Sequence, residues 1–86
     1  MNPAQVQPLR VIVKFRVAVP YRDEAFLRGI AQKINARMVY LTSVSPDTHV
    51  YQVEPLQGQS LADITRSLSS VPAVLYAEAD ALMKPL

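Results

Sequence analysis

The 86-residue chain has no cysteine, only two glycines and a single histidine. Without cysteine there is no thiol catalysis, iron–sulfur ligation, cysteine-based zinc site or disulfide framework. The two glycines, Gly29 and Gly58, lie too far apart to form a glycine-rich phosphate-binding loop. A metal site needs several convergent ligands, and no acid cluster or second histidine accompanies His49 at a suitable spacing. The sequence therefore predicts neither a metal nor a cofactor.

Long apolar runs and clusters of one charge are also missing. No apolar run approaches the roughly 18 residues expected of a membrane span. The nine Lys and Arg residues are scattered and the net charge is only +2, which argues against nucleic acid as a partner. Residues 1–8 lack the basic start and apolar core of a signal peptide. The chain is therefore either intracellular or cut from a precursor whose signal lay upstream.

Half of the residues are hydrophobic, which is enough for one small domain to fold without a metal or a disulfide. The residues from Leu9 to Val19 predict a strand, because Val11, Val13, Phe15 and Val17 alternate with mostly basic residues and belong in the core. Pro20 ends this strand.

A helix follows, with acids in its first turn at Asp23 and Glu24 and an apolar stripe at Phe26, Ile30 and Ile34. It is expected to end at Asn35-Ala36, because asparagine tolerates the left-handed conformation that closes helices.

Two further strands, Met38–Val44 and His49–Glu54, flank a proline-containing turn and predict an antiparallel hairpin. Ser60 and Asp63 resemble a capping box at the start of a second helix, whose apolar face carries Leu61, Ile64 and Leu68. A last strand covers about Val74–Glu78. This order predicts an α+β, ferredoxin-like βαββαβ sandwich, an antiparallel four-stranded sheet with both helices on one face and the other face open.

The chain does not look like an enzyme. His49 would serve as a proton shuttle in one interpretation, but a lone histidine in a hairpin is more often an ordinary surface or core-edge residue. The serines at 67, 69 and 70 have no nearby histidine or lysine pattern to activate them. An RNA-recognition domain of this fold needs aromatic residues on its open face, and only Tyr76 is a candidate. A regulatory, ligand-binding domain of the ACT kind stays open, since such sites have no compact motif.

Glu78 and Asp80 close the last strand, and a mostly apolar tail of residues 81–86 follows. The two acids have an ordinary interpretation, as a polar strand end that keeps the sheet edge soluble. In the functional interpretation, both carboxylates point to the free N–H groups at helix starts in another protein. Ile12, Val74 and Tyr76 are then the candidate apolar contacts on the open sheet face.

These residues also carry a resemblance to a known family. The stretch Val71-Pro-Ala-Val-Leu-Tyr-Ala-Glu-Ala-Asp80 resembles the closing motif of subtilisin propeptides and of the related propeptide-like protease inhibitors, Asp-Pro-x-Val-x-Tyr-Val-Glu-x-Asp. The stretch Arg10-Val-Ile-Val-Lys-Phe-Arg16 is similar to the family's opening strand. The resemblance covers residues 9–86. Val71, Ala77 and Asn35-Ala36 depart from the family pattern, but both acids are kept.

The resemblance implies a set of roles. The open sheet face would pack on two helices of a subtilisin-like serine protease, with Glu78 and Asp80 capping those helices. The tail would lie in the substrate cleft like a cleaved product, with Leu86 in the pocket before the scissile bond. Met83 would enter the apolar pocket farther from the cut. The cleft-binding residues would be Ala81, Leu82, Met83, Lys84, Pro85 and Leu86.

The sequence therefore predicts a lead-in over residues 1–8, an inhibitor domain over residues 9–80 and a cleft-binding tail over residues 81–86. The expected function is inhibition of a subtilisin-like protease, in cis or in trans, and the resemblance adds a role as an intramolecular chaperone. Cut from a protease precursor, the chain would be secreted or periplasmic; a cytoplasmic location stays open. The alternative is the ACT-type regulatory domain, which would not need residues 81–86.

Overall fold

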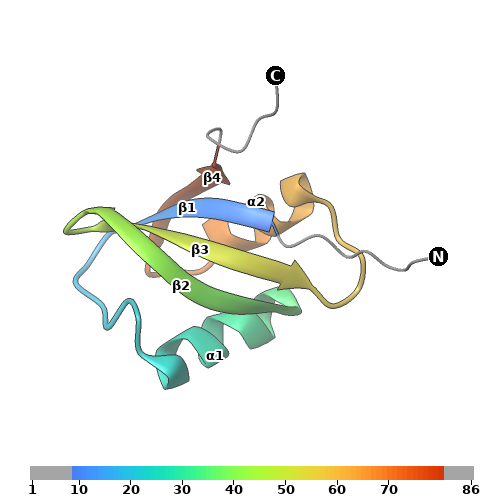
Figure 1. Ribbon diagram of the computed structural model, residues 1–86, viewed down its shortest axis with the longest axis horizontal. Helices are drawn as coiled ribbons and strands as arrows, with labels where there is room; N and C mark the ends of the chain where they lie inside the picture. Colours follow the sequence, from blue (N-terminus) through green and yellow to red (C-terminus); the bar gives the residue numbers. More distant parts are fainter. Residues whose placement is uncertain (1–8, 81–86) are drawn as a thin grey trace.

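The computed structural model describes residues 9–80 as one antiparallel sheet and two helices (Figure 1). The predicted α+β class and the βαββαβ order are confirmed. The predictions for residues 1–8 and 81–86 fall outside the described residues. In chain order the elements are β1 (Leu9–Phe15), α1 (Glu24–Ile34), β2 (Ala36–Ser45), β3 (Thr48–Pro55), α2 (Leu61–Ser69) and β4 (Val74–Ala79).

The described strands lie in the order β2-β3-β1-β4, and every neighbouring pair is antiparallel. Each helix therefore joins two parallel strands that have a third strand between them: α1 joins β1 to β2 across β3, and α2 joins β3 to β4 across β1. Both helices lie on the same side of the sheet (Figure 1). The strands β2 and β4 form the two edges of the described sheet.

The core lies between the helices and one face of the sheet. Alternate residues of the central strands are fully buried there, among them Val11 and Val13 of β1 and Tyr51 and Val53 of β3. The apolar faces of the helices cover them with Leu27, Ile30, Ile34, Ile64 and Leu68. The period-two and helical patterns of the sequence therefore point to the same core.

The first strand is shorter than its alternation predicts. After Lys14 the register to β4 shifts, and the Phe15 and Arg16 N–H groups donate to the carbonyls of Asp47 and Ala73 instead of continuing one ladder. The Arg16 guanidinium also donates to the Pro72 and Val74 carbonyls. The chain leaves the sheet at this bulge, so the prediction that Val17 belongs in the core is wrong: its side chain is exposed.

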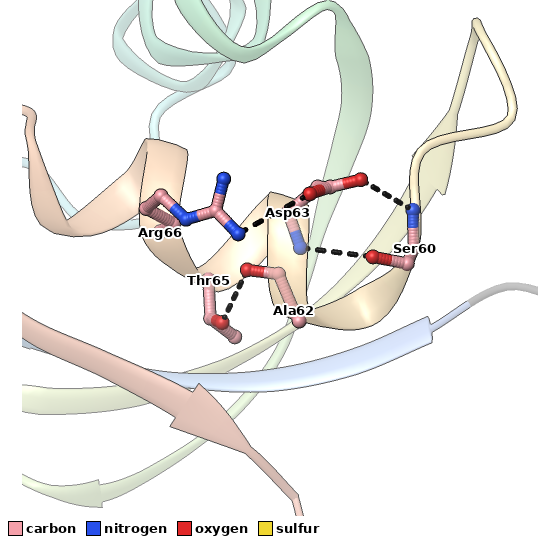
Figure 2. A network of polar contacts seen from close by, with 5 residues as sticks. All are labelled: Ser60, Ala62, Asp63, Thr65 and Arg66. Carbon is pink, nitrogen blue, oxygen red and sulfur yellow. Dashed lines mark hydrogen bonds and ion pairs between the residues drawn. The ribbon is translucent and has the colours of Figure 1, made fainter.

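Local capping chemistry sets where the helices begin and end. The Asp23 side chain accepts a hydrogen bond from the Phe26 N–H at the start of α1. At the start of α2, the Ser60 hydroxyl accepts from the Asp63 N–H, and the Asp63 carboxylate accepts from the Ser60 N–H (Figure 2). This confirms the predicted capping box. Asn35, at φ 55°, ends α1 in the left-handed conformation, as the sequence predicts.

Candidate functional site

The sheet face opposite the helices is centred on Arg10, Ile12 and Lys14 of β1, because the alternate residues of that strand are buried in the core. Cross-strand pairing places β3 residues Gln52, Val50 and Thr48 beside them on one side. On the other side, Ile12 pairs with Glu78 and Lys14 pairs with Tyr76 of β4. Directly paired residues share a face, so Tyr76 and Glu78 lie on the open face, as the sequence predicts.

A small apolar patch occupies the middle of this face. We define the open-face patch as Ile12, Val50 and Tyr76. Val50 is only 5% exposed although it is not part of the core under the helices, and the Tyr76 side chain is 42% exposed. Val50 was missed by sequence analysis. The signal was its cross-strand position opposite Ile12, which only the register between β1 and β3 reveals.

Val74 does not belong to this patch. It is fully buried, lies in the core and pairs with Phe15 beyond the bulge that separates it from the Lys14–Tyr76 pair. Because the bulge adds a residue to one strand, it shifts the alternation of β4 at this end. The prediction that Val74 is a contact on the open face is therefore wrong.

The two predicted acids occupy different environments. The Glu78 side chain is exposed at the edge strand, next to Ile12. Asp80 is buried, and its Oδ2 lies 3.1 Å from Nε of Arg10, whose side chain is one-third exposed. The Asp80 N–H also donates to the Arg10 carbonyl at 3.1 Å, which extends the β1–β4 pairing by one residue. Only Glu78 presents its carboxylate outward as the functional interpretation requires.

The remaining charges of the open face are weakly paired. Lys14 Nζ lies 3.8 Å from an oxygen of Asp47 in the β2–β3 turn. Hydrogen bonds from the Ser45 and Thr48 hydroxyls, helped by Lys14, lower the pKa of the Asp47 carboxyl below its usual value. Arg37 and Glu54 approach to 3.9 Å, with both side chains exposed, so this pair contributes little to stability.

A histidine site lies on the helix side of the hairpin. His49 is 1% exposed, stacks on the Tyr21 ring at a centroid distance of 3.8 Å, and shares a 2.7 Å hydrogen bond between its Nδ1 and the Ser43 hydroxyl. The Ser43 hydroxyl lies 2.7 Å from the Tyr40 hydroxyl. Burial lowers the pKa of His49, so the neutral imidazole is favoured.

Sequence analysis missed this Ser43–His49 pair, since the two residues meet only through the hairpin register. A hydroxyl beside a neutral imidazole is the starting point of a nucleophilic serine. Among residues 9–80, however, no carboxylate hydrogen-bonds to the imidazole to orient it. The contacts of His49 instead tie the Tyr21 loop to the hairpin.

The described part of the chain contains neither a cluster of metal ligands nor a helix that could span a membrane. Within residues 9–80, no three metal-ligating side chains gather in one place. None of the helices described there has the length and apolar character to cross a membrane. No protein-family model matches the chain, and no curated protein or solved structure shows significant similarity to it.

Proposed function

We propose that this protein inhibits a subtilisin-like serine protease, as a propeptide or as a propeptide-like inhibitor. The observation that carries the proposal is the exposed Glu78 carboxylate, held at the edge of the open sheet face beside the open-face patch. A carboxylate next to an apolar patch suits the N-terminus of a partner helix, where unpaired N–H groups and the helix dipole attract an anion. The closing-motif resemblance around this strand supplies the identity of the partner.

In this proposal Glu78 acts on the partner and Asp80 acts within the chain. The Arg10–Asp80 pair holds the backbone of residue 80 against β1. It thereby fixes the point from which residues 81–86 would continue toward the substrate cleft. Capping of a second protease helix by Asp80 would first require this ion pair to open, which makes Glu78 the stronger candidate of the two.

The test is inhibition of a subtilisin by the full chain, measured with a chromogenic peptide substrate. Glu78→Ala should weaken inhibition about 2- to 30-fold, the range expected for one helix-capping carboxylate from the exposed to the partly buried case. Glu24→Ala is the matched control, because it removes one exposed acid from the helix side of the molecule. Equal inhibition constants for the two variants would refute the capping role.

The tail is tested separately. A chain that ends at Asp80 should bind without blocking the cleft, and full-length Leu86→Asp should inhibit poorly because a carboxylate does not suit an apolar pocket. Circular dichroism spectra of both variants check that they are folded. If the full chain neither binds nor inhibits any subtilisin-type enzyme, the proposal fails. The regulatory-domain alternative predicts that residues 81–86 make no difference to binding.

A further inference from the structure

The edge strand β2 exposes more apolar surface than an edge normally does. Val39, Leu41 and Val44 of this strand are all exposed, and β2 is the terminal strand on its side of the described sheet. Within residues 9–80 no strand pairs with its outer edge. Natural edge strands are usually guarded by charges, prolines, bulges or short length. The bulges of β2 come only after Tyr40, so the exposed Val39 lies on a stretch that they do not guard, which indicates a surface with a partner.

A groove runs beside this edge. It lies between α1 and β2, which are neighbours in Figure 1, and it has a volume of about 700 Å³. Leu27 and Ala31 of α1, Met38 and Tyr40 of β2, and Leu56 after β3 make its apolar lining. A volume of this size is within the range of sites that hold a ligand or a short peptide segment.

The rim of the groove is positively charged. Arg22, Arg28 and Arg37 line it, and Glu24 is the only acid among the lining residues. Neither Arg22 nor Arg28 forms an ion pair with any residue in the described part of the chain; Arg22 lies over the Tyr40 ring at 5.9 Å. Such a rim complements an occupant that carries carboxylates.

The form of the edge limits the occupant to a short strand. Ala36–Tyr40 pairs with β3 in unbroken register, but the register shifts between Tyr40 and Thr42 and again between Ser43 and Ser45. Bulges of this kind twist an edge away from further pairing. The regular segment offers about 17 Å of strand, and it is the part of β2 that borders the groove.

A second copy of the chain fits this surface poorly. Symmetric pairing restricted to Ala36–Tyr40 would be centred on Met38, which makes the two Arg37 side chains diagonal neighbours on one face and brings both arginine rims together. Like charges held this close repel each other. The chain's own segments 1–8 and 81–86 contain no acid at all, so they do not complement the rim either.

We propose that the groove between α1 and β2 binds an extended acidic peptide of a partner protein, which adds a strand to the Ala36–Tyr40 edge. Main-chain hydrogen bonds to the edge would supply affinity, as in other cases of strand addition. Peptide side chains on the helix side would pack on the apolar lining and pair with Arg22 and Arg28, and the alternate ones on the open side would face Arg37. The site lies on the opposite sheet edge from Glu78 and does not depend on protease inhibition.

In the experiment, the immobilised full-length protein selects its ligands from a phage-displayed library of short random peptides. Selected sequences should be enriched in Asp and Glu alternating with apolar residues. Binding of a synthetic peptide from this selection, followed by fluorescence anisotropy, should weaken as salt is raised. When this peptide is added, the NMR chemical-shift changes of the protein's backbone amides should be confined to α1 and residues 36–40.

Arg28→Glu and Lys33→Glu form a matched pair of variants. Both reverse one exposed charge on α1, but only Arg28 lines the groove. Arg28→Glu should weaken peptide binding about 3- to 30-fold, since an attraction is lost and a repulsion is added, and Lys33→Glu should change it little. Equal effects of the two variants would overturn the proposal, as would selected peptides without acids. If sedimentation shows that the protein forms dimers that cannot bind the peptide, the edge belongs to a second copy of the chain, and the proposal is overturned as well.

Discussion

Replacement of Asp80 by alanine should destabilise the isolated protein, whereas the same replacement of its neighbour Glu78 should not. The Asp80 side chain is 2% exposed and contacts the Arg10 guanidinium at 3.1 Å. Removing one member of such an ion pair leaves a buried polar group of the other unsatisfied, which costs about 1–3 kcal/mol. The Arg10 side chain is one-third exposed and can be rehydrated when its partner is removed, which places the expected loss at about 1.5–2 kcal/mol. Glu78 is exposed, and its removal should stay within about 0.5 kcal/mol.

The assay is unfolding by urea and by heat, followed by circular dichroism. For a domain of this size, each kcal/mol corresponds to about 4–8 °C in melting temperature, so Asp80→Ala should melt roughly 6–16 °C below Glu78→Ala. Arg10→Met and the Arg10→Met/Asp80→Ala double variant complete a mutant cycle. Its coupling energy should be about 1 kcal/mol or more. Equal melting temperatures of the two alanine variants, or a coupling near zero, would refute a structural role for the pair.

Three further outcomes follow from the local structure. Ser60→Ala removes one half of the capping box of α2 and should lower the free energy of unfolding by about 1 kcal/mol, as measured in urea. Asn35 has a φ of 55°, so Asn35→Ala should lower the melting temperature and Asn35→Gly should not. Burial lowers the pKa of His49 from 6.5, so the unfolded chain takes up a proton at this residue at a higher pH than the folded protein does. The contribution of neutral His49 to the free energy of unfolding should therefore be at its maximum above about pH 7 and fall as the pH drops through 6.5 toward the folded pKa. His49→Gln should abolish this slope, and a slope that persists in the variant would show that another group causes it.

The fold followed from the sequence where local pattern and local chemistry agree. The alternation in β1, the apolar stripes of both helices and the Ser60–Asp63 capping box each depend on residues within one turn or one strand. The wrong prediction that Val17 is buried in the core has a different cause. The apolar alternation continues past Phe15, but a bulge and the hydrogen bonds of Arg16 to residues 72–74 redirect the chain. Those partners are more than fifty positions away, and nothing near Val17 in the sequence signals them.

The site shows the same limit more sharply, because its character depends on which residues face each other across strands. Glu78 and Asp80 look equivalent in the sequence, because two residues separated by one other in a strand lie on the same face. Glu78 pairs with Ile12 and remains exposed, whereas Asp80 lies opposite Arg10 and is buried. The identity of the residue on β1 therefore separates an outward-facing carboxylate from an internal one. It follows that exchanging the partners, with Arg10→Ile and Ile12→Arg in one chain, should draw Glu78 into an ion pair and release Asp80. In that chain Glu78→Ala should no longer be neutral for stability, and a Glu78→Ala change that stays neutral would show that something other than the facing residue sets the two environments.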